Sequence, residues 1–185
     1  MIRSVFTVIL ICIIFFSSFS QIKEKTYLAG GGLSLSYIDI SHKENNSFNF
    51  SISPDAGYMF TDAFGMGLSL LYSISNSDDY KENNLGIGPY ARYYFNKEMV
   101  SPFLTGIFEY EKKTTHYNGE KKINNSYLGA AFGPGIAFFI NNHVSLEAML
   151  TYKHLVAKDK GGGAYKKNNL DLIIGFQVYL PIENP

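Results

Sequence analysis

The chain has 185 residues, of which 46% are hydrophobic, 16% aromatic and 17% charged, and its formal charge is zero. This length and composition suit one domain of modest size. The balanced charge excludes the clustered basic excess that nucleic-acid binding requires, so we expect no nucleic-acid partner.

The N-terminus has the pattern of a secretory signal peptide. Arg3 gives it a positive start, Val5 to Phe16 form an apolar run, and Ser18-Phe19-Ser20 places small residues before Gln21. The apolar run is too short for a comfortable membrane-spanning helix, which was the alternative. We therefore predict a cleaved signal peptide over residues 1–20 and one domain over residues 21–185.

The only cysteine, Cys12, lies inside this predicted signal peptide and not at the position of a lipid-anchor cysteine. The mature chain is therefore predicted to have no disulfide and no cysteine metal site. No two of its four histidines have metal-ligand spacing. We expect neither a metal nor a cofactor.

From Tyr27 onward, apolar and small or polar residues alternate with a period of two in eight segments, which is typical of β-strands. Long polar loops alternate with short turns near Thr61, Asn96 and Asn141, and no stretch has the period of an amphipathic helix. The predicted strands are 27–37, 48–60, 65–74, 85–95, 102–111, 127–140, 144–153 and 169–180. The predicted long loops are 39–46, 76–84, 112–125 and 156–167.

Three of these strands repeat one motif, in which a proline lies seven residues ahead of a short polar turn. The prolines are Pro54, Pro89 and Pro134, with large apolar residues four and six positions after each. Proline removes one hydrogen bond of a strand ladder and is usual at edges and bulges. We expect a repeated bulge or bend that helps the sheet to curve.

The two faces of the strands indicate the environment. One face has no charged residue in any of the eight strands, whereas the other is padded with Gly and Ser and carries all the charges. If the charged face points inward, the apolar face must meet hydrocarbon, and only a closed barrel leaves no unpaired strand edge there. Strands of about 9–11 residues suffice to span a bilayer. The charged residues are Asp55, Arg92, Glu109, Glu111, Glu147, Lys153 and Asp171.

This pattern predicts an all-β, eight-stranded, antiparallel up-and-down transmembrane barrel. Short turns and both mature termini are expected on the periplasmic side, and long loops outside. Aromatic residues on the apolar face form two predicted girdles at the membrane interfaces. The outer girdle is Tyr37, Tyr72, Tyr110 and Tyr152, and the inner girdle is Tyr58, Phe60, Tyr93, Phe95 and Phe138. A soluble lipocalin-like binder, with the faces reversed, is the rival interpretation.

Three motifs carry a family resemblance: Ser53-Pro54 with Gly57-Tyr58 and Phe60, Gly88-Pro89 with Ala91 to Phe95, and Pro102-Phe103-Leu104. In these the chain resembles the small OmpA/OmpX-like outer-membrane barrel domains common in Bacteroidetes. The resemblance implies location in the bacterial outer membrane and contact with its lipid, its lipopolysaccharide and the barrel-assembly machinery. Family chains often end in an aromatic assembly signal, which here is displaced, for example to Tyr179.

The resemblance implies a fold and a location and assigns no activity. We expect a structural or surface-interaction role, membrane-stabilising or adhesin-like with a possible extracellular ligand on the loops, and no enzymatic one. The inward charges are predicted to pair into a plug that fills the lumen, since an eight-stranded barrel is just wide enough for its side chains. The alternative is a narrow or gated pathway, which makes a small porin-like channel the second candidate function.

The sequence contains two further candidate sites. Loop lysines are expected to be solvated or, alternatively, to contact lipopolysaccharide phosphates: Lys121, Lys122, Lys158 and Lys160. A lipid A-modifying enzyme is the third candidate function, because such barrel enzymes place a catalytic histidine near the outer interface, where His154 is predicted to lie. However, Tyr152-Lys153-His154-Leu155 lacks the nearby serine of the deacylase pattern, so we predict no catalytic residue.

Overall fold

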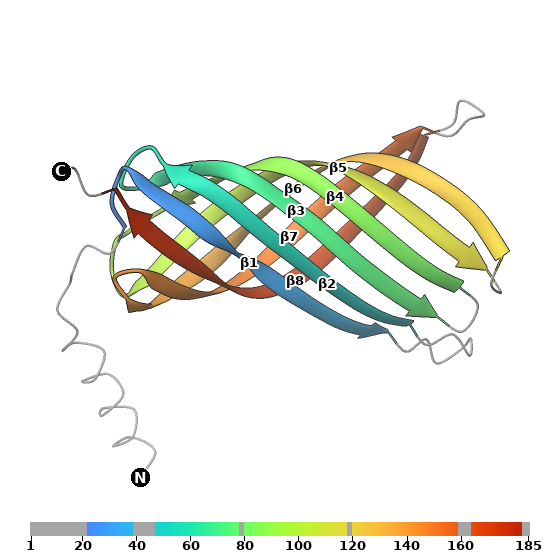
Figure 1. Ribbon diagram of the computed structural model, residues 1–185, viewed down its shortest axis with the longest axis horizontal. Coiled ribbons are helices and arrows are strands. Elements are labelled where there is room, and N and C mark those ends of the chain that lie inside the picture. Colours follow the sequence, from blue (N-terminus) through green and yellow to red (C-terminus); the bar gives the residue numbers. More distant parts are fainter. Residues whose placement is uncertain (1–21, 39–46, 78–79, 118–119, 159–163, 183–185) are drawn as a thin grey trace, which may run out of the picture.

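Eight antiparallel strands close into one barrel, in which each strand pairs with its neighbours in the chain and β1 pairs with β8 (Figure 1). The computed structural model describes residues 22–38, 47–77, 80–117, 120–158 and 164–182. The predicted signal peptide, 1–20, lies outside them. The strands are β1 Thr26–Ile38, β2 Ser47–Met59, β3 Phe64–Ser77, β4 Tyr80–Tyr94, β5 Val100–Tyr117, β6 Glu120–Asn141, β7 Val144–Lys158 and β8 Ala164–Pro181.

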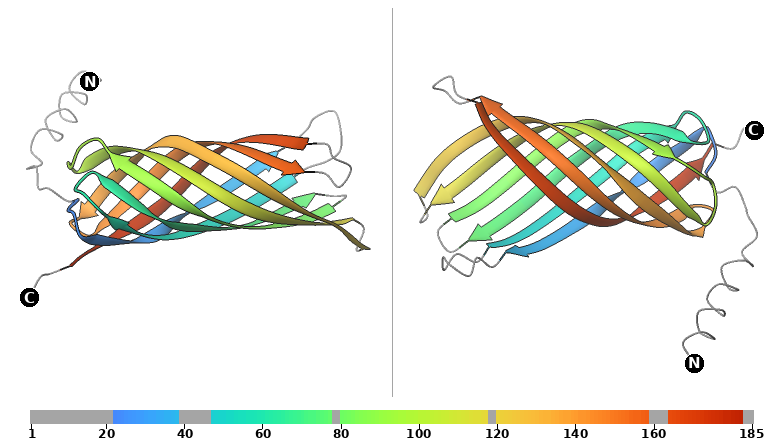
Figure 2. Two further views of the ribbon diagram at one scale, coloured as in Figure 1. Left: turned by 90° about the horizontal axis from the view of Figure 1, so that it is seen from above. Right: turned by 180° about the vertical axis from the view of Figure 1, so that it is seen from behind.

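The predicted fold class is therefore confirmed, and the strands run tilted around the closed barrel (Figure 2). Both ends of the described chain lie at one end of the barrel, which we call the basal end (Figure 1). We call the opposite end the distal end. No helix in the described ranges is long and apolar enough to cross a membrane.

The apolar face points out of the barrel and the charged face points in. Leu35 on the outward face is 68% exposed, whereas Arg92 on the inward face is 5% exposed. Every strand has large hydrophobic side chains on its outward face that are exposed, as Leu35 is. A soluble barrel would bury such residues, because exposing them to water is costly. This arrangement contradicts the lipocalin-like alternative.

The strands extend beyond the predicted bounds at the distal end, so the long loops of the prediction are partly wrong. The predicted loop 112–125 is mostly strand, because β5 continues to Tyr117 and β6 begins at Glu120. The same holds for much of 76–84 and 156–167. Backbone pairing needs no apolar face, so it continues where both faces are polar. Hydrophobic alternation, on which the prediction relied, ends with the apolar band.

The predicted girdle residues lie on the outward face at two levels. Tyr72, Tyr110 and Tyr152 are exposed toward the distal end, while Phe60, Tyr93, Phe95 and Phe138 are exposed near the basal turns. Tyr58 is half-buried between Tyr27 and Phe60, whose ring centroids lie 5.4 and 5.1 Å away. Tyr37 lies in β1, but its side chain is outside the described ones. Their role as membrane-interface anchors stays a prediction.

Each of the three repeated prolines interrupts one ladder without shifting its register. Pairing between β4 and β5 passes from Ile87↔Tyr110 to Tyr90↔Ile107, so Pro89 is skipped while the partners stay in step. Pro54 and Pro134 interrupt the β2–β3 and β6–β7 ladders in the same way. A bulge at the prolines is therefore wrong, because the register shifts lie elsewhere, at Thr115/His116 and at Phe139/Asn141. A missing amide hydrogen removes a bond but inserts no residue. The alternative, a bend that helps the sheet to curve, stays a prediction.

The seam between the first and last strands is the shortest ladder of the barrel. It runs from Thr26↔Pro181 to Leu33↔Ile174, whereas the β1–β2 ladder continues to Ile38↔Ser47. Gly31 in this seam has a φ of 148°, which L side chains rarely adopt. A Cβ there would lie 2.6 Å from the carbonyl oxygen of Ser53, so glycine is required by both conformation and space.

Candidate functional site

The basal end of the lumen is closed by apolar and aromatic side chains, which we call the basal plug. Its members come from the inward face near the short turns and from the N-terminal lead-in: Ile22, Leu28, Met59, Tyr94, Phe103, Ala137, Phe139 and Tyr179. Ile22 is 0% exposed. The ring centroids of Tyr94 and Phe103 lie 5.5 Å apart, and those of Phe139 and Tyr179 lie 5.1 Å apart. Contacts of this kind exclude water from the basal lumen.

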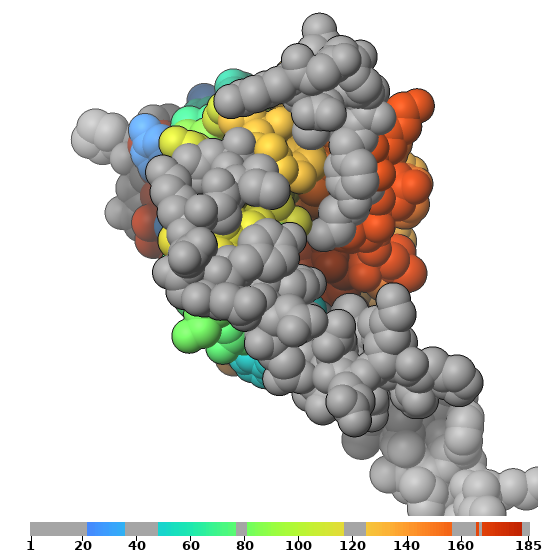
Figure 3. All heavy atoms as spheres, turned by 90° about the vertical axis from the view of Figure 1, so that its right-hand side faces the viewer, coloured from blue at the N-terminus to red at the C-terminus, as the bar shows by residue number. Residues whose placement is uncertain are grey.

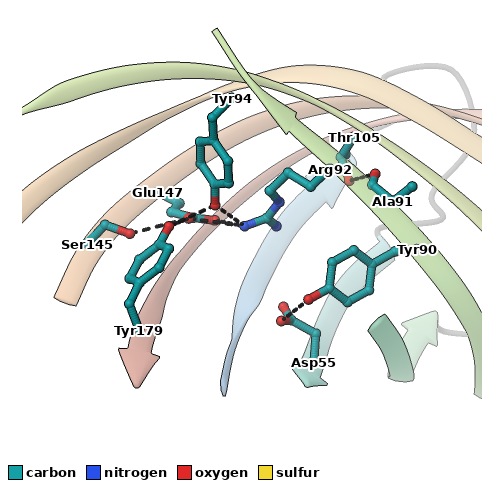
Figure 4. A network of polar contacts seen from close by, with 9 residues as sticks. All are labelled: Asp55, Tyr90, Ala91, Arg92, Tyr94, Thr105, Ser145, Glu147 and Tyr179. Carbon is teal, nitrogen blue, oxygen red and sulfur yellow. Dashed lines mark hydrogen bonds and ion pairs between the residues drawn. The ribbon is translucent and has the colours of Figure 1, made fainter. Parts of the chain in front are cut away.

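Above the plug, a buried ion pair joins opposite walls of the barrel (Figure 4). Arg92 Nη1 on β4 donates to both carboxylate oxygens of Glu147 on β7, at 2.8 and 3.1 Å. The two residues are only 5% and 9% exposed. A charge pair this deep is tolerable only with further hydrogen bonds.

Tyrosines of the plug supply those bonds. Arg92 Nη1 donates to Tyr94 Oη at 3.2 Å, and the hydroxyls of Tyr94 and Tyr179 lie 2.7 Å apart. Tyr179 and Ser145 both donate to Glu147 Oε1, at 3.4 and 3.3 Å. The guanidinium carbon of Arg92 also lies 4.5 Å from the ring centroid of Phe103, which is cation–π distance. The plug and the ion pair thus form one unit.

Asp55 lies beside this unit without pairing with Arg92. It accepts a hydrogen bond from the hydroxyl of Tyr90 at 3.2 Å (Figure 4). Tyr90 is on β4, two residues before Arg92, and points into the lumen with it. Asp55 therefore remains a carboxylate that faces the lumen and is held by a neutral donor.

A second charge cluster lies in the distal half of the lumen. The ammonium of Lys153 on β7 is 2.8 Å from Glu109 Oε1 and 2.9 Å from Glu111 Oε1, both on β5. Asn84 on β4 donates from Nδ2 to the other oxygen of Glu111. Farther along, Lys113 and Glu82 form an ion pair at 2.5 Å. Ion pairs therefore connect β7 with β5 and β5 with β4.

The lumen beyond the Arg92–Glu147 pair is hollow. A cavity of about 1230 Å³ is lined by the charged residues above and by the serine-rich wall of β2 and β3. The prediction that paired charges fill the lumen is therefore wrong: apolar and aromatic side chains close the basal end, and the charged residues line a cavity. The reason is residue size: the facing wall carries Ser51, Ser53, Ser69 and Ser73, which are too small to fill the space.

The structure brings together the predicted lumen residues in two groups: Arg92 with Glu147, and Lys153 with Glu109 and Glu111. Asp55 and Asp171 line the same cavity. Sequence reasoning missed the plug, including Ile22, and missed the Lys113–Glu82 pair. For the plug residues on strands the signal was available, because inward-facing positions become large and apolar within a few residues of each basal turn. Tyr179, the suggested displaced assembly signal, points inward and is fully buried.

The remaining predicted sites lie elsewhere. Lys121, Lys122 and Lys158 belong to strands, but their side chains are outside the described ones, as is Lys160 altogether. His154 is half-buried and points outward, with Nδ1 2.6 Å from Asn168 Oδ1. Among the described residues, no group of three or more His, Cys, Asp or Glu side chains is arranged to hold a metal ion.

The basal turns are tied together by Asp62. Its carboxylate accepts hydrogen bonds from the Lys97 ammonium at 2.5 Å and from the Glu24 amide at 2.7 Å. The bond from Lys97, followed by that from Glu24, lowers the pKa of Asp62 below its ordinary value. The N-terminal lead-in, which carries Ile22 into the plug, is thereby fastened to the β2–β3 turn.

This fastening gives stability a pH dependence. Because the pKa of Asp62 is lower in the folded state, its contribution is complete above the unfolded value of about 4 and is lost as pH falls through the folded pKa. We expect Asp62→Asn to lower the urea midpoint at neutral pH, with the difference from wild type shrinking in acid. Glu98→Gln, which neutralises an exposed carboxylate on the next turn, is the control. A pH-independent difference would contradict this role.

Comparisons with known proteins agree with this architecture. The family model described as outer membrane protein beta-barrel domain matches residues 6–177. No curated protein matches the chain.

Three solved structures show the same fold. The N-terminal barrel domain of Pseudomonas aeruginosa OprF has 14% identity and a TM-score of 0.56, over 85% of this chain and 98% of that one. Neisserial surface protein A has 18% identity and a TM-score of 0.54, over 83% and 94%. Ail, the attachment invasion locus protein of Yersinia pestis, has 15% identity and a TM-score of 0.50, over 84% and 98%. At these identities the likeness concerns the fold alone.

Proposed function

The chain belongs to the outer membrane protein beta-barrel domain family, and from this membership we propose that it is a surface-exposed barrel that binds lipopolysaccharide and stabilises the outer membrane. It is a small bacterial outer-membrane β-barrel. The proposed role rests on outward-facing lysines beyond the distal girdle, and it takes the distal end as the cell exterior. We expect no catalytic activity, and a signal peptide over residues 1–20.

Three lysines carry the proposal, and we call them the distal lysines: Lys81 on β4, Lys112 on β5 and Lys166 on β8. All three are exposed. Each lies on the outward face, past the apolar band. Lys112 follows Tyr110 by two positions, so its ammonium lies where the headgroups of the outer leaflet would be. Phosphates on lipopolysaccharide attract such charges.

The distal lysines replace the loop lysines of the sequence prediction as the best-supported contacts. Lys113, by contrast, points inward to Glu82. Neighbouring outward groups are polar and uncharged or weakly basic, for example His116, which is the register partner of Lys81. The outward surface is thus apolar up to the girdle and basic directly beyond it.

The test compares urea midpoints of the refolded protein in phosphatidylcholine bilayers with and without lipopolysaccharide. We expect lipopolysaccharide to raise the midpoint of the wild type. The triple variant Lys81→Gln, Lys112→Gln, Lys166→Gln should lose most of that increase, because it removes the charges that face the phosphates. Added salt should weaken the wild-type effect.

Lys23→Gln with Lys25→Gln is the control, since both lysines are exposed at the basal end. It should keep the full increase. An equal increase in the triple variant would contradict the proposal.

A small pore is the second candidate, favoured by the cavity of about 1230 Å³. The basal plug opposes it, because Tyr94, Phe103, Phe139 and Tyr179 leave almost no exposed surface among them. Single-channel recording in planar bilayers separates the two roles, and a steady conductance in the wild type would favour the pore.

A further inference from the structure

The distal cavity is closed at its basal side. The basal plug and the Arg92–Glu147 pair form its floor, and its walls continue to Glu82 and Thr115 near the distal strand ends. Figure 3 looks onto that end, where the strand ends of β5 to β8 appear in yellow to red. Its volume of about 1230 Å³ is ample for a small organic molecule.

Negative charge predominates in this cavity. Its described lining includes six carboxylates and three cationic side chains, a balance of minus three at neutral pH. The carboxylates are Asp55, Glu82, Glu109, Glu111, Glu147 and Asp171, and the cations are Arg92, Lys113 and Lys153. Each cation is already within ion-pair distance of a carboxylate. Glu109 and Glu111 share the single ammonium of Lys153, and Asp55 accepts from the neutral hydroxyl of Tyr90. These carboxylates can therefore attract a cationic solute, and low-dielectric walls strengthen their field.

A buried acceptor without a partner points to the same kind of solute. Asn84 is 9% exposed, lines the cavity, and donates from Nδ2 to Glu111. Its Oδ1 has no hydrogen-bond partner among the described atoms. Leaving such an oxygen unsatisfied costs about 1–3 kcal/mol. The group that it lacks is an N–H or O–H donor, and an ammonium supplies both the donor and the charge.

The arrangement favours an elongated organic cation over a metal ion. No described group of His, Cys, Asp and Glu side chains converges as metal ligands do. Instead the acidic residues lie at successive levels. Glu109 lies four residues distal to Thr105, the register partner of Arg92, which is roughly 13 Å along the strand. Between the levels, Ile107, Met149 and Ile173 offer apolar surface for methylene groups.

We propose that the distal cavity binds a linear organic polyamine, with ammonium groups at the Glu109–Glu111 level and at the Asp55–Glu147 level. Asn84 Oδ1 accepts a hydrogen bond from the first of these. The serine hydroxyls of β2 and β3 line the opposite side of the bound chain. This binding is independent of the distal lysines, which face outward.

The test uses calorimetric titration of the refolded protein with spermidine in zwitterionic micelles. We expect saturable one-to-one binding that is at least tenfold tighter than the response to Mg²⁺ at equal ionic strength. Glutarate, which carries the opposite charge, should not bind. Glu109→Gln and Asp55→Asn each remove one charge and keep the shape of the side chain. Each should weaken the affinity for spermidine roughly tenfold, equivalent to about 1.4 kcal/mol.

Glu98→Gln, which removes a charge outside the cavity, should leave the affinity unchanged. The gel-mobility difference between boiled and unboiled samples verifies that each variant is closed, and Asp55→Asn decides the question if Glu109→Gln fails to close. Equal responses to spermidine and Mg²⁺, or affinities unchanged in a closed cavity variant, would overturn the proposal.

Discussion

Glu147→Ala is expected to destabilise the barrel by about 3–5 kcal/mol, because it leaves the guanidinium of Arg92 buried without its counter-charge. Arg92 is 5% exposed, and the neighbours that it keeps include the hydroxyl of Tyr94 and the rings of Phe103 and Tyr90. Its Nε already has no hydrogen-bond partner among the described atoms. The measurement is the urea midpoint of the refolded protein, together with loss of the gel-mobility difference on heating.

The double variant Arg92→Met, Glu147→Met separates charge from packing. Replacing a whole buried pair by apolar residues is often neutral or stabilising, so it should recover most of the loss. Glu98→Ala, at an exposed position, should be neutral. If Glu147→Ala unfolds at the wild-type midpoint, the ion pair contributes nothing to stability and its burial is coincidental.

Gly133→Ala is expected to have the second large effect, about 3 kcal/mol, through collision with backbone. A Cβ at this position would lie 1.9 Å from the carbonyl oxygen of Leu150 and 2.8 Å from the Cα of Thr151. Both atoms belong to β7, so relief requires β6 and β7 to move apart beside the ladder that Pro134 already interrupts. The measurements are again the urea midpoint and the gel-mobility difference on heating, and we expect a lower yield of closed barrel.

Gly106→Ala is the matched control, because a Cβ there would meet nothing within 4 Å. Glycine in a strand interior costs roughly 0.5–1 kcal/mol in chain entropy, so this change should be neutral or slightly stabilising. Equal behaviour of the two variants would show that the space around Gly133 adapts and that the close approach of the strands is not required.

The fold was predictable because each strand carries a strict alternation, and a charged inward face leaves only one closed architecture in lipid. Outward residues such as Leu35 and inward residues such as Arg92 were assigned correctly from period alone. The distal ends of the strands were not predictable from this period, because strand pairing continues to Tyr117 and Glu120 among residues with no apolar face.

The lumen was predictable in its residues but not in its filling. The charged positions follow from the inward face, yet their partners depend on register and stagger around the barrel, which alternation does not specify. Arg92 and Glu147 are 55 positions apart. Ile22 lies in a polar lead-in, so nothing local indicated that it enters the plug. The distal half is hollow because small serines on β2 and β3 face the charged residues of the other strands. Predicting this requires comparing side-chain sizes across strands, which the pattern along one strand does not show.

The short seam between β1 and β8 determines where the barrel wall opens transiently. Its ladder ends at Leu33↔Ile174, so it has fewer backbone bonds to break than the other strand junctions. Regions with few bonds open at lower free energy than the whole molecule, and hydrogen exchange reports them. We therefore expect transient opening to begin at the distal end of this seam. It should stop at the N-terminal lead-in, which the hydrogen bond from Glu24 to Asp62 holds to the β2–β3 turn.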